Sequence, residues 1–133
     1  MSKKNVEIAR RVLNAPEHEG VEALFALYDP QIVWDQRAGP IELVGVYHGH
    51  EGVREFWRQW LESFESQKAH PEEFIDAGNK VVVGMRIVGR GKASGIDVEM
   101  PRWTVMTFEN ALVTGIEVFE SKAEALRAAG LQE

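Results

Sequence analysis

Residues 47–64, YHGHEGVREFWRQWLESF, contain the pattern that decides the fold. From residue 53 onward, apolar side chains recur at helical spacing and form one stripe: Val53, Phe56, Trp57, Trp60, Leu61 and Phe64. Charged and amide side chains occupy the other side of the same segment. The pattern predicts a central amphipathic helix over residues 53–64 with an unusual aromatic content.

The segment before this helix predicts two helices, one strand and a loop. Apolar positions three and four apart over residues 6–13 and 21–28 predict consecutive helices, with Pro16 and Gly20 between them. Asp29-Pro30 ends the second helix, because a residue before proline avoids the α region. A strand is then expected at about 31–36. Three glycines and a proline in residues 37–49 predict a loop.

The segment after the central helix predicts four strands and a terminal helix. Residues 74–83 predict a strand, a turn at Gly78-Asn79 and the start of a second strand, which extends over 81–88. Further strands are expected at 96–109 and 112–119. A helix is expected over 122–129, with Ser121 as its N-cap. Consecutive hairpins with segregated helices indicate an α+β fold. We expect a cone-shaped, curved antiparallel sheet packed on three helices from the N-terminal half, with a short C-terminal helix, enclosing an apolar pocket.

Length and composition narrow the classes of function. The 133 residues suit a single domain spanning 1–133, and the absence of cysteine excludes disulfides and thiolate metal sites. A net charge of −6 with scattered Lys and Arg argues against a nucleic-acid partner. No stretch approaches the roughly 18 apolar residues of a membrane helix, and the N-terminus lacks the apolar core of a secretory signal. We therefore expect a cytoplasmic protein without a membrane partner.

Three motifs carry a family resemblance: YHGHEGVREFW at 47–57, FIDAG at 74–78, and IEVF at 116–119 before a helix rich in Glu and Ala. With the element order above, they make the chain resemble a SnoaL-like domain over about residues 5–131. That domain is a branch of the nuclear transport factor 2-like superfamily of cone-shaped α+β folds. The superfamily includes polyketide cyclases, ketosteroid isomerases, scytalone dehydratase and limonene epoxide hydrolase, so the resemblance implies the fold more specifically than the activity.

The resemblance implies one catalytic candidate, Asp35. It lies at the end of the first strand, where the isomerases and some cyclases place a general-base carboxylate, and desolvation in a dry pocket would suit that role. The other isomerase groups are missing. The tyrosine position of the first helix falls near Ala9, and the acid position falls on Trp103 or Thr104. The resemblance therefore favours a cyclase over a ketosteroid isomerase.

Further site candidates come from the residue types. His50 or Arg86 is the polar assistant expected beside Asp35. Because no ligand pattern includes His48 and His50, we expect no metal site, and the chain has no glycine-rich phosphate loop that would indicate a cofactor. Charged residues within apolar strands either form cross-sheet salt bridges or anchor a ligand. The expected pocket residues are Trp34, Tyr47, Phe56, Trp57, Trp60, Arg86, Arg102, Trp103, Glu117 and Phe119.

Two functions of different class stay open on the sequence. The first is cyclase- or isomerase-type acid/base catalysis, without a cofactor, on a hydrophobic small molecule that contains a carbonyl group. The second is a binding or dimerisation module that uses the same pocket without turnover. Strands 81–88 and 96–109 are apolar on both faces, so we also expect a homodimer joined through the outer faces of the sheets.

Overall fold

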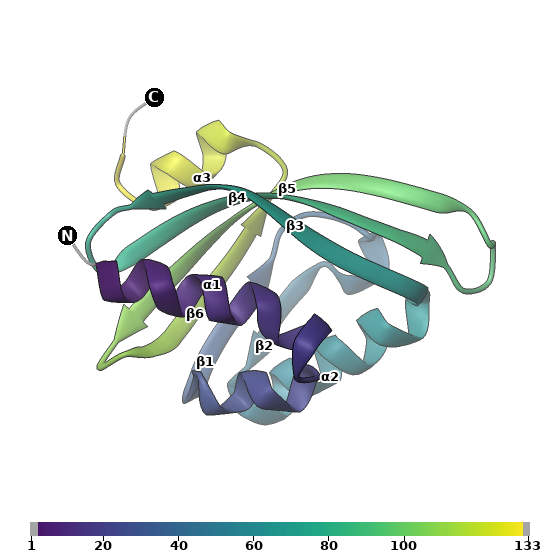
Figure 1. Ribbon diagram of the computed structural model, residues 1–133, viewed down its shortest axis with the longest axis horizontal. Helices are drawn as coiled ribbons and strands as arrows, with labels where there is room; N and C mark the ends of the chain where they lie inside the picture. The colour runs from purple at the N-terminus through teal and green to yellow at the C-terminus, as the bar shows by residue number, and fades with distance from the viewer. Residues whose placement is uncertain (1–2, 132–133) are drawn as a thin grey trace.

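A six-stranded curved sheet is the centre of the fold, with α1 and α2 on its inner face and α3 on its outer face (Figure 1). The computed structural model describes residues 3–131. The elements follow in the order α1 (Lys3–His18), η1 (Val21–Ala26), β1 (Tyr28–Gln36), η2 (Ile41–Leu43), β2 (Gly45–His48), α2 (Gly49–Ser63), β3 (Phe64–Asp76), β4 (Lys80–Gly91), β5 (Asp97–Glu109), β6 (Leu112–Phe119) and α3 (Lys122–Ala128). The predicted α+β class and curved sheet are confirmed.

The strands lie in the order β2-β1-β6-β5-β4-β3. Four neighbouring pairs are antiparallel. The fifth pair, β1 with β6, is parallel, with Trp34 opposite Ile116 and Gln36 opposite Val118. The sheet therefore differs from the predicted antiparallel one at this pair, because hairpin signals describe only strands that are close in sequence.

The two edge strands also depart from the sequence prediction. β2 lies inside the segment predicted as a loop, and β3 begins at Phe64, well before the predicted strand start at residue 74. Each has one neighbouring strand in the sheet, and β3 tolerates Pro71 beside a register shift. Edge strands carry polar residues and proline more readily than central ones, so their periodicity is weak. The second predicted helix is the 3₁₀ helix η1.

Apolar packing on the inner face joins α1 and α2 to the sheet. Helix α1 contributes a buried stripe that includes Ile8, Ala9 and Val12, and α2 contributes Val53, Phe56 and Trp60. Helix α3 begins at Ser121, whose hydroxyl accepts the Glu124 N–H at 3.2 Å, as expected for the predicted N-cap. Its Ala125 joins Val82, Val105 and Phe119 of the sheet in a second, outer cluster of buried residues.

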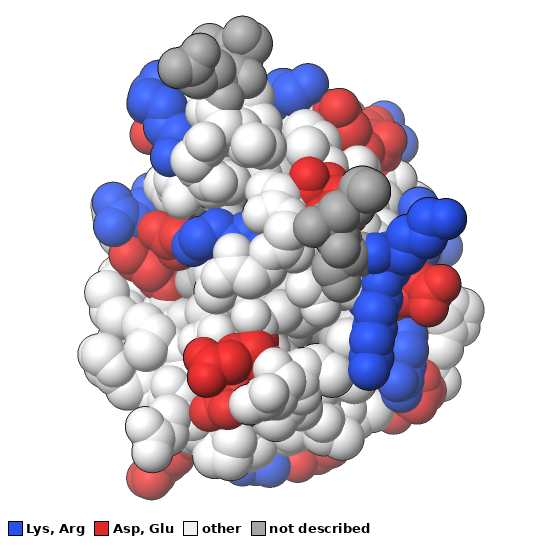
Figure 2. All heavy atoms as spheres, turned by 90° about the vertical axis from the view of Figure 1, so that its left-hand side faces the viewer, with Lys and Arg blue, Asp and Glu red and all other residues white. Residues whose placement is uncertain are grey.

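Charges of both signs are interspersed over the face shown in Figure 2, where Lys and Arg lie among Asp and Glu. Arg54 pairs with Glu22 at 2.9 Å, and Lys122 pairs with Glu73 at 3.2 Å. Among residues 3–131, no helix combines the length and the apolar character needed to cross a membrane.

One glycine in β4 is required by a tryptophan in β5. Gly84 lies opposite Trp103, whose indole ring crosses the glycine on the outer face of the sheet. A Cβ atom at residue 84 would lie 2.5 Å from the ring, closer than nonbonded carbon atoms approach. The indole therefore occupies the space that any other side chain at this position would fill.

We expect Gly84→Ala to lower the free energy of unfolding by about 1–3 kcal/mol, the usual cost of overpacking. Chemical denaturation measures the change. Gly115→Ala is the matched control, because its Cβ would meet Thr107 at an ordinary 3.6 Å. If Gly84→Ala costs as little as Gly115→Ala, or costs as much in a Trp103→Ala background, the steric explanation is wrong.

Candidate functional site

A cavity of about 130 Å³ lies between the inner face of the sheet and helices α1 and α2. Strand residues reach it from β1, β3, β4, β5 and β6, and its lining is mostly apolar. An apolar cavity of roughly 150 Å³ in another protein accepts benzene, so this volume suits one aromatic ring or a group of similar size. The enclosed apolar pocket expected from the sequence is therefore present.

Aromatic side chains from β1 and α2 form one wall of the cavity. Trp34 packs on Phe56 with ring centroids 4.6 Å apart and meets Trp57 edge to face at 5.9 Å. Trp60 stacks on Phe56 with ring centroids 6.1 Å apart. These four predicted pocket residues do line the cavity, and their contacts fix the rings as one rigid group.

Tyr47 supports this wall from behind and does not line the cavity. Its ring lies 5.2 Å from that of Phe56, and its hydroxyl donates to Leu43 O at 2.8 Å. The Trp34 indole is fixed in a similar way, because its Nε1–H donates to Gln36 Oε1 at 2.9 Å. Gln36 Nε2 in turn donates to Ala38 O at 3.0 Å. Both aromatic orientations therefore depend on hydrogen bonds around the cavity.

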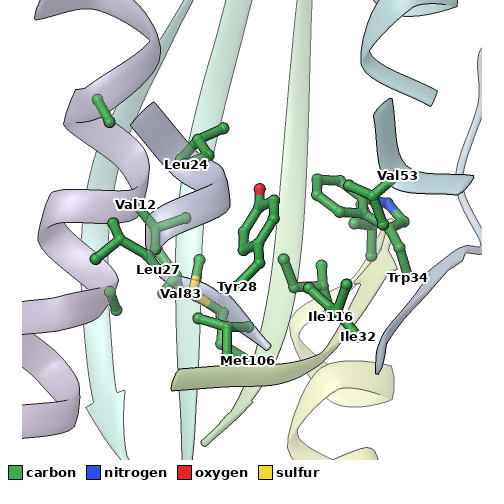
Figure 3. Packing of buried hydrophobic residues seen from close by; sticks show 14 of the residues in the cluster. Val12, Leu24, Leu27, Tyr28, Ile32, Trp34, Val53, Val83, Met106 and Ile116 are labelled. Carbon is green, nitrogen blue, oxygen red and sulfur yellow. The ribbon is translucent and has the colours of Figure 1, made fainter. Parts of the chain in front are cut away.

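Three polar atoms at the cavity are buried without a hydrogen-bond partner: Tyr28 Oη, Trp57 Nε1 and Trp60 Nε1. Figure 3 shows the Tyr28 hydroxyl directed away from Met106 and Ile116, between Leu24 and Trp34. Burial raises the pKa of Tyr28, and Trp57 lowers it by a smaller amount. The Trp57 N–H therefore approaches the hydroxyl, although the two groups do not meet the distance and angle of a hydrogen bond. Buried polar groups are normally satisfied, so three unpaired atoms in one cavity are unusual.

The structure places Asp35 on the opposite face of β1 from this cavity. Side chains alternate along a strand, so Trp34 and Gln36 point inward while Asp35 points outward. Arg37 donates to Asp35 Oδ2 from its Nε and from a terminal nitrogen, both at 2.9 Å. The strand end chosen from the resemblance does reach the cavity, but through Gln36.

His50 also lies outside the cavity, in the first turn of α2. Its Nε2 is 2.9 Å from Tyr28 O, and its ring meets Phe25 edge to face at 5.2 Å. The imidazole therefore joins α2 to the start of β1 through a backbone carbonyl. The catalytic roles of Asp35 and His50 stay predictions, and neither side chain faces the site.

Four predicted pocket residues lie away from the cavity. Arg86, Trp103, Glu117 and Phe119 alternate with inward residues on β4, β5 and β6, so they belong to the outer face. Arg86 Nε lies 3.7 Å from Glu99 Oε1, the cross-strand partnership considered from the sequence. Phe119 is buried under α3. Of the charged candidates, Arg102 alone among these described residues lines the cavity.

Sequence reasoning missed several residues that line the site. Tyr28 was included in the predicted helix over 21–28, although it begins β1. Gln36 and Thr104 are inward neighbours of residues that were considered, and the two-residue period of their strands could have indicated them. Lys68 and Gln67 lie on β3, where no strand was predicted.

The titratable groups at the cavity include no carboxylate and no imidazole among the described lining residues. They are Tyr28, Lys68 and Arg102. Groups of three or more His, Asp or Glu that could hold a metal ion are not found within residues 3–131. The cavity therefore offers hydrogen-bond donors and positive charge against an aromatic wall.

Comparisons with known proteins agree with this architecture. The model of the SnoaL-like domain matches residues 9–116. A nuclear transport factor 2-like protein of unknown function from Burkholderia pseudomallei K96243 is 26% identical, with 96% of this chain and 97% of that chain covered and a TM-score of 0.81. A comparison with curated proteins gave no match.

Two other solved structures similar to this chain contain small molecules. TerC, co-crystallised with polyporic acid, is 19% identical, with 96% of this chain and 99% of that chain covered and a TM-score of 0.80. A protein with a ketosteroid isomerase-like fold from Catenulispora acidiphila DSM 44928, in complex with trimethylamine, is 18% identical. The match covers 94% of this chain and 93% of that chain, with a TM-score of 0.76.

The fold and its cavity define a nuclear transport factor 2-like protein. More narrowly, the chain belongs to the SnoaL-like domain family, since the family model matches most of its length.

The unpaired hydroxyl of Tyr28 leads to a prediction that compares the stability effects of replacing the two tyrosines of the chain. Tyr28→Phe removes an unsatisfied buried group, so we expect the free energy of unfolding to rise by about 1 kcal/mol. Tyr47→Phe removes the bond to Leu43 O and is expected to lower it by about 1 kcal/mol. Urea denaturation of both variants without ligand gives the comparison. A destabilised Tyr28→Phe would show that a partner, such as a buried water, satisfies the hydroxyl.

Proposed function

We propose that this protein binds a hydrophobic, planar small molecule that carries a carbonyl-type acceptor oxygen, in the cavity between α1, α2 and the sheet. The observation that carries the proposal is the set of unpaired donors, Tyr28, Trp57 and Trp60, at an aromatic-walled cavity. Indole N–H groups only donate, and leaving donors buried without a partner costs free energy. An acceptor oxygen on a bound molecule would recover that cost.

Binding has more support here than acid/base catalysis. Proton transfer near neutral pH is most often performed by an imidazole or a carboxylate within hydrogen-bond reach of the substrate. Asp35 points outward against Arg37, and His50 contacts Tyr28 O outside the cavity. The second candidate is a cyclase- or isomerase-type reaction, favoured by the neutral Tyr28 hydroxyl, which could polarise a carbonyl. A carboxylate or imidazole base for this reaction is not found among the described lining residues.

The experiment uses acetophenone, a neutral aromatic ketone, and ethylbenzene, the hydrocarbon with the same carbon skeleton and no oxygen. Tryptophan fluorescence reports binding, because Trp34, Trp57 and Trp60 line the cavity. We expect acetophenone to bind, and Tyr28→Phe to weaken it about 3- to 10-fold, the loss of one hydrogen bond. The affinity for ethylbenzene is expected to stay unchanged in the same variant.

Matched variants separate the cavity from its surroundings. Tyr47→Phe and Asp35→Asn lie outside the cavity and are expected to leave the affinity for acetophenone unchanged. Equal losses for the ketone and the hydrocarbon in Tyr28→Phe would contradict the hydrogen bond. No binding of either compound at millimolar concentration would overturn the proposal.

The homodimer expected from the sequence is a separate proposal. The outer face of the sheet exposes less apolar surface than the strand composition predicts. Helix α3 covers one part of it, and the ion pairs Arg86–Glu99 and Arg90–Asp97 occupy another. What supports a dimer is exposed apolar surface around β1 and β2, where Val33 is 39% and Val46 is 51% exposed.

Sedimentation velocity at micromolar concentration is expected to give twice the monomer mass. Val46→Lys is expected to shift the equilibrium towards monomer, because it places a charge on that outer surface. Ile96→Lys, at an exposed site beyond β4, is the control and is expected to leave the mass unchanged. A monomeric wild-type protein would contradict the homodimer.

A further inference from the structure

Arg102 is held at the cavity by the alternation of β5. It lies on the same face of this strand as Thr104 and Met106, and all three line the cavity. Trp103, between them, crosses Gly84 on the outer face. The position of Trp103 therefore fixes the direction of its neighbour, so Arg102 can leave the cavity only by turning its side chain.

Two backbone carbonyl groups orient the guanidinium group of Arg102. One terminal nitrogen donates to Pro101 O at 2.7 Å, and the other donates to Gly39 O at 2.8 Å. A guanidinium group has five N–H donors, so these bonds leave three unused. The loop that follows β1 thus fixes the plane of the group before any ligand arrives.

The charge of Arg102 has no carboxylate in salt-bridge contact among the described residues, unlike Arg37, Arg54, Arg58 and Arg90. Burial lowers the pKa of Arg102, and the charge of Glu120 opposes that change more weakly. A partly buried cation without an ion pair is a costly arrangement that a bound anion relieves.

The other residues that line the cavity also favour a negatively charged ligand. Lys68 is the second cationic residue at the cavity, and the described lining residues include no Asp or Glu. An aromatic wall can also hold a cation, but the guanidinium group of Arg102 would repel it.

We propose that the ligand is a small aromatic oxyanion, of the arenecarboxylate type, whose anionic group binds the Arg102 guanidinium while its ring lies against the aromatic wall. The inference rests on the proposed function and adds the charge of the ligand to it. Arginine suits this role because its planar fork matches the two oxygens of a carboxylate. The assignment makes Arg102 the residue that discriminates an anionic from a neutral aromatic ligand.

The test compares benzoate with acetophenone, its neutral analogue of the same size, by fluorescence titration at pH 7. We expect the wild-type protein to bind benzoate roughly tenfold more tightly than acetophenone, as for a charge-assisted hydrogen bond. Arg102→Gln is expected to bring the ratio of the benzoate affinity to the acetophenone affinity near one, and to leave the affinity for acetophenone unchanged. Arg102→Lys is expected to keep part of the preference, since it retains the charge without the fork.

Arg90→Gln is the matched control, because it removes a sheet arginine paired with Asp97 away from the cavity. An equal fall in the ratio for Arg90→Gln would overturn the proposal in favour of a nonspecific charge effect. A ratio unchanged in Arg102→Gln but lost in Lys68→Gln would overturn it in favour of Lys68. If Arg102→Gln does not fold, the ratio in the wild-type protein and in Arg102→Lys decides.

The outcomes distinguish the two proposals. If acetophenone binds and benzoate binds no better, the oxyanion inference fails while the proposed function stands. If neither compound binds, the proposed function itself fails. A benzoate preference that disappears in Arg102→Gln, with Arg90→Gln unaffected, supports both.

Discussion

The alternation of side chains along the central strands is the constraint on which the site depends. In β1 it turns Trp34 and Gln36 into the cavity and leaves Asp35 with Arg37 outside. In β5 it turns Arg102 and Thr104 inward and Trp103 outward. A shift of β1 by one residue would put Asp35 in the place of Trp34 in the interior, and a shift of β5 would put Trp103 in the place of Arg102. The buried partners of Trp34 on α2 prevent that shift, so the core packing also sets the chemistry of the cavity.

The sequence determined the central elements well, because their signals are local. The stripe on α2 and the hairpin limits of β5 and β6 lie within a few residues of the observed ones. The parallel pairing of β1 with β6 had no local signal, since the two strands meet only after the whole sheet is assembled. The edge strand β3 carries Pro71 and several charges, which hide its period.

The candidate site was predictable in part, and the errors share one physical cause. The four aromatic residues of the wall followed from residue type, but the charged candidates required the inward face of each strand to be known. If Trp34 is assigned to the inner face, the two-residue period of the strand places Asp35 on the outer face and Gln36 on the inner face. Tyr28 was hidden differently, because the apolar spacing of residues 21–28 continued the helical pattern into the first residue of β1.

The parallel contact between β1 and β6 also has a consequence for how the chain acquires its structure during synthesis. The strand that carries Trp34 emerges from the ribosome early, whereas its partner Ile116 belongs to the last strand. Until β6 arrives, β1 has only the short strand β2 as a neighbour in the sheet. Pairing at such sequence separation is slow to nucleate. The nascent N-terminal half therefore needs protection from aggregation until nearly the whole chain has been made.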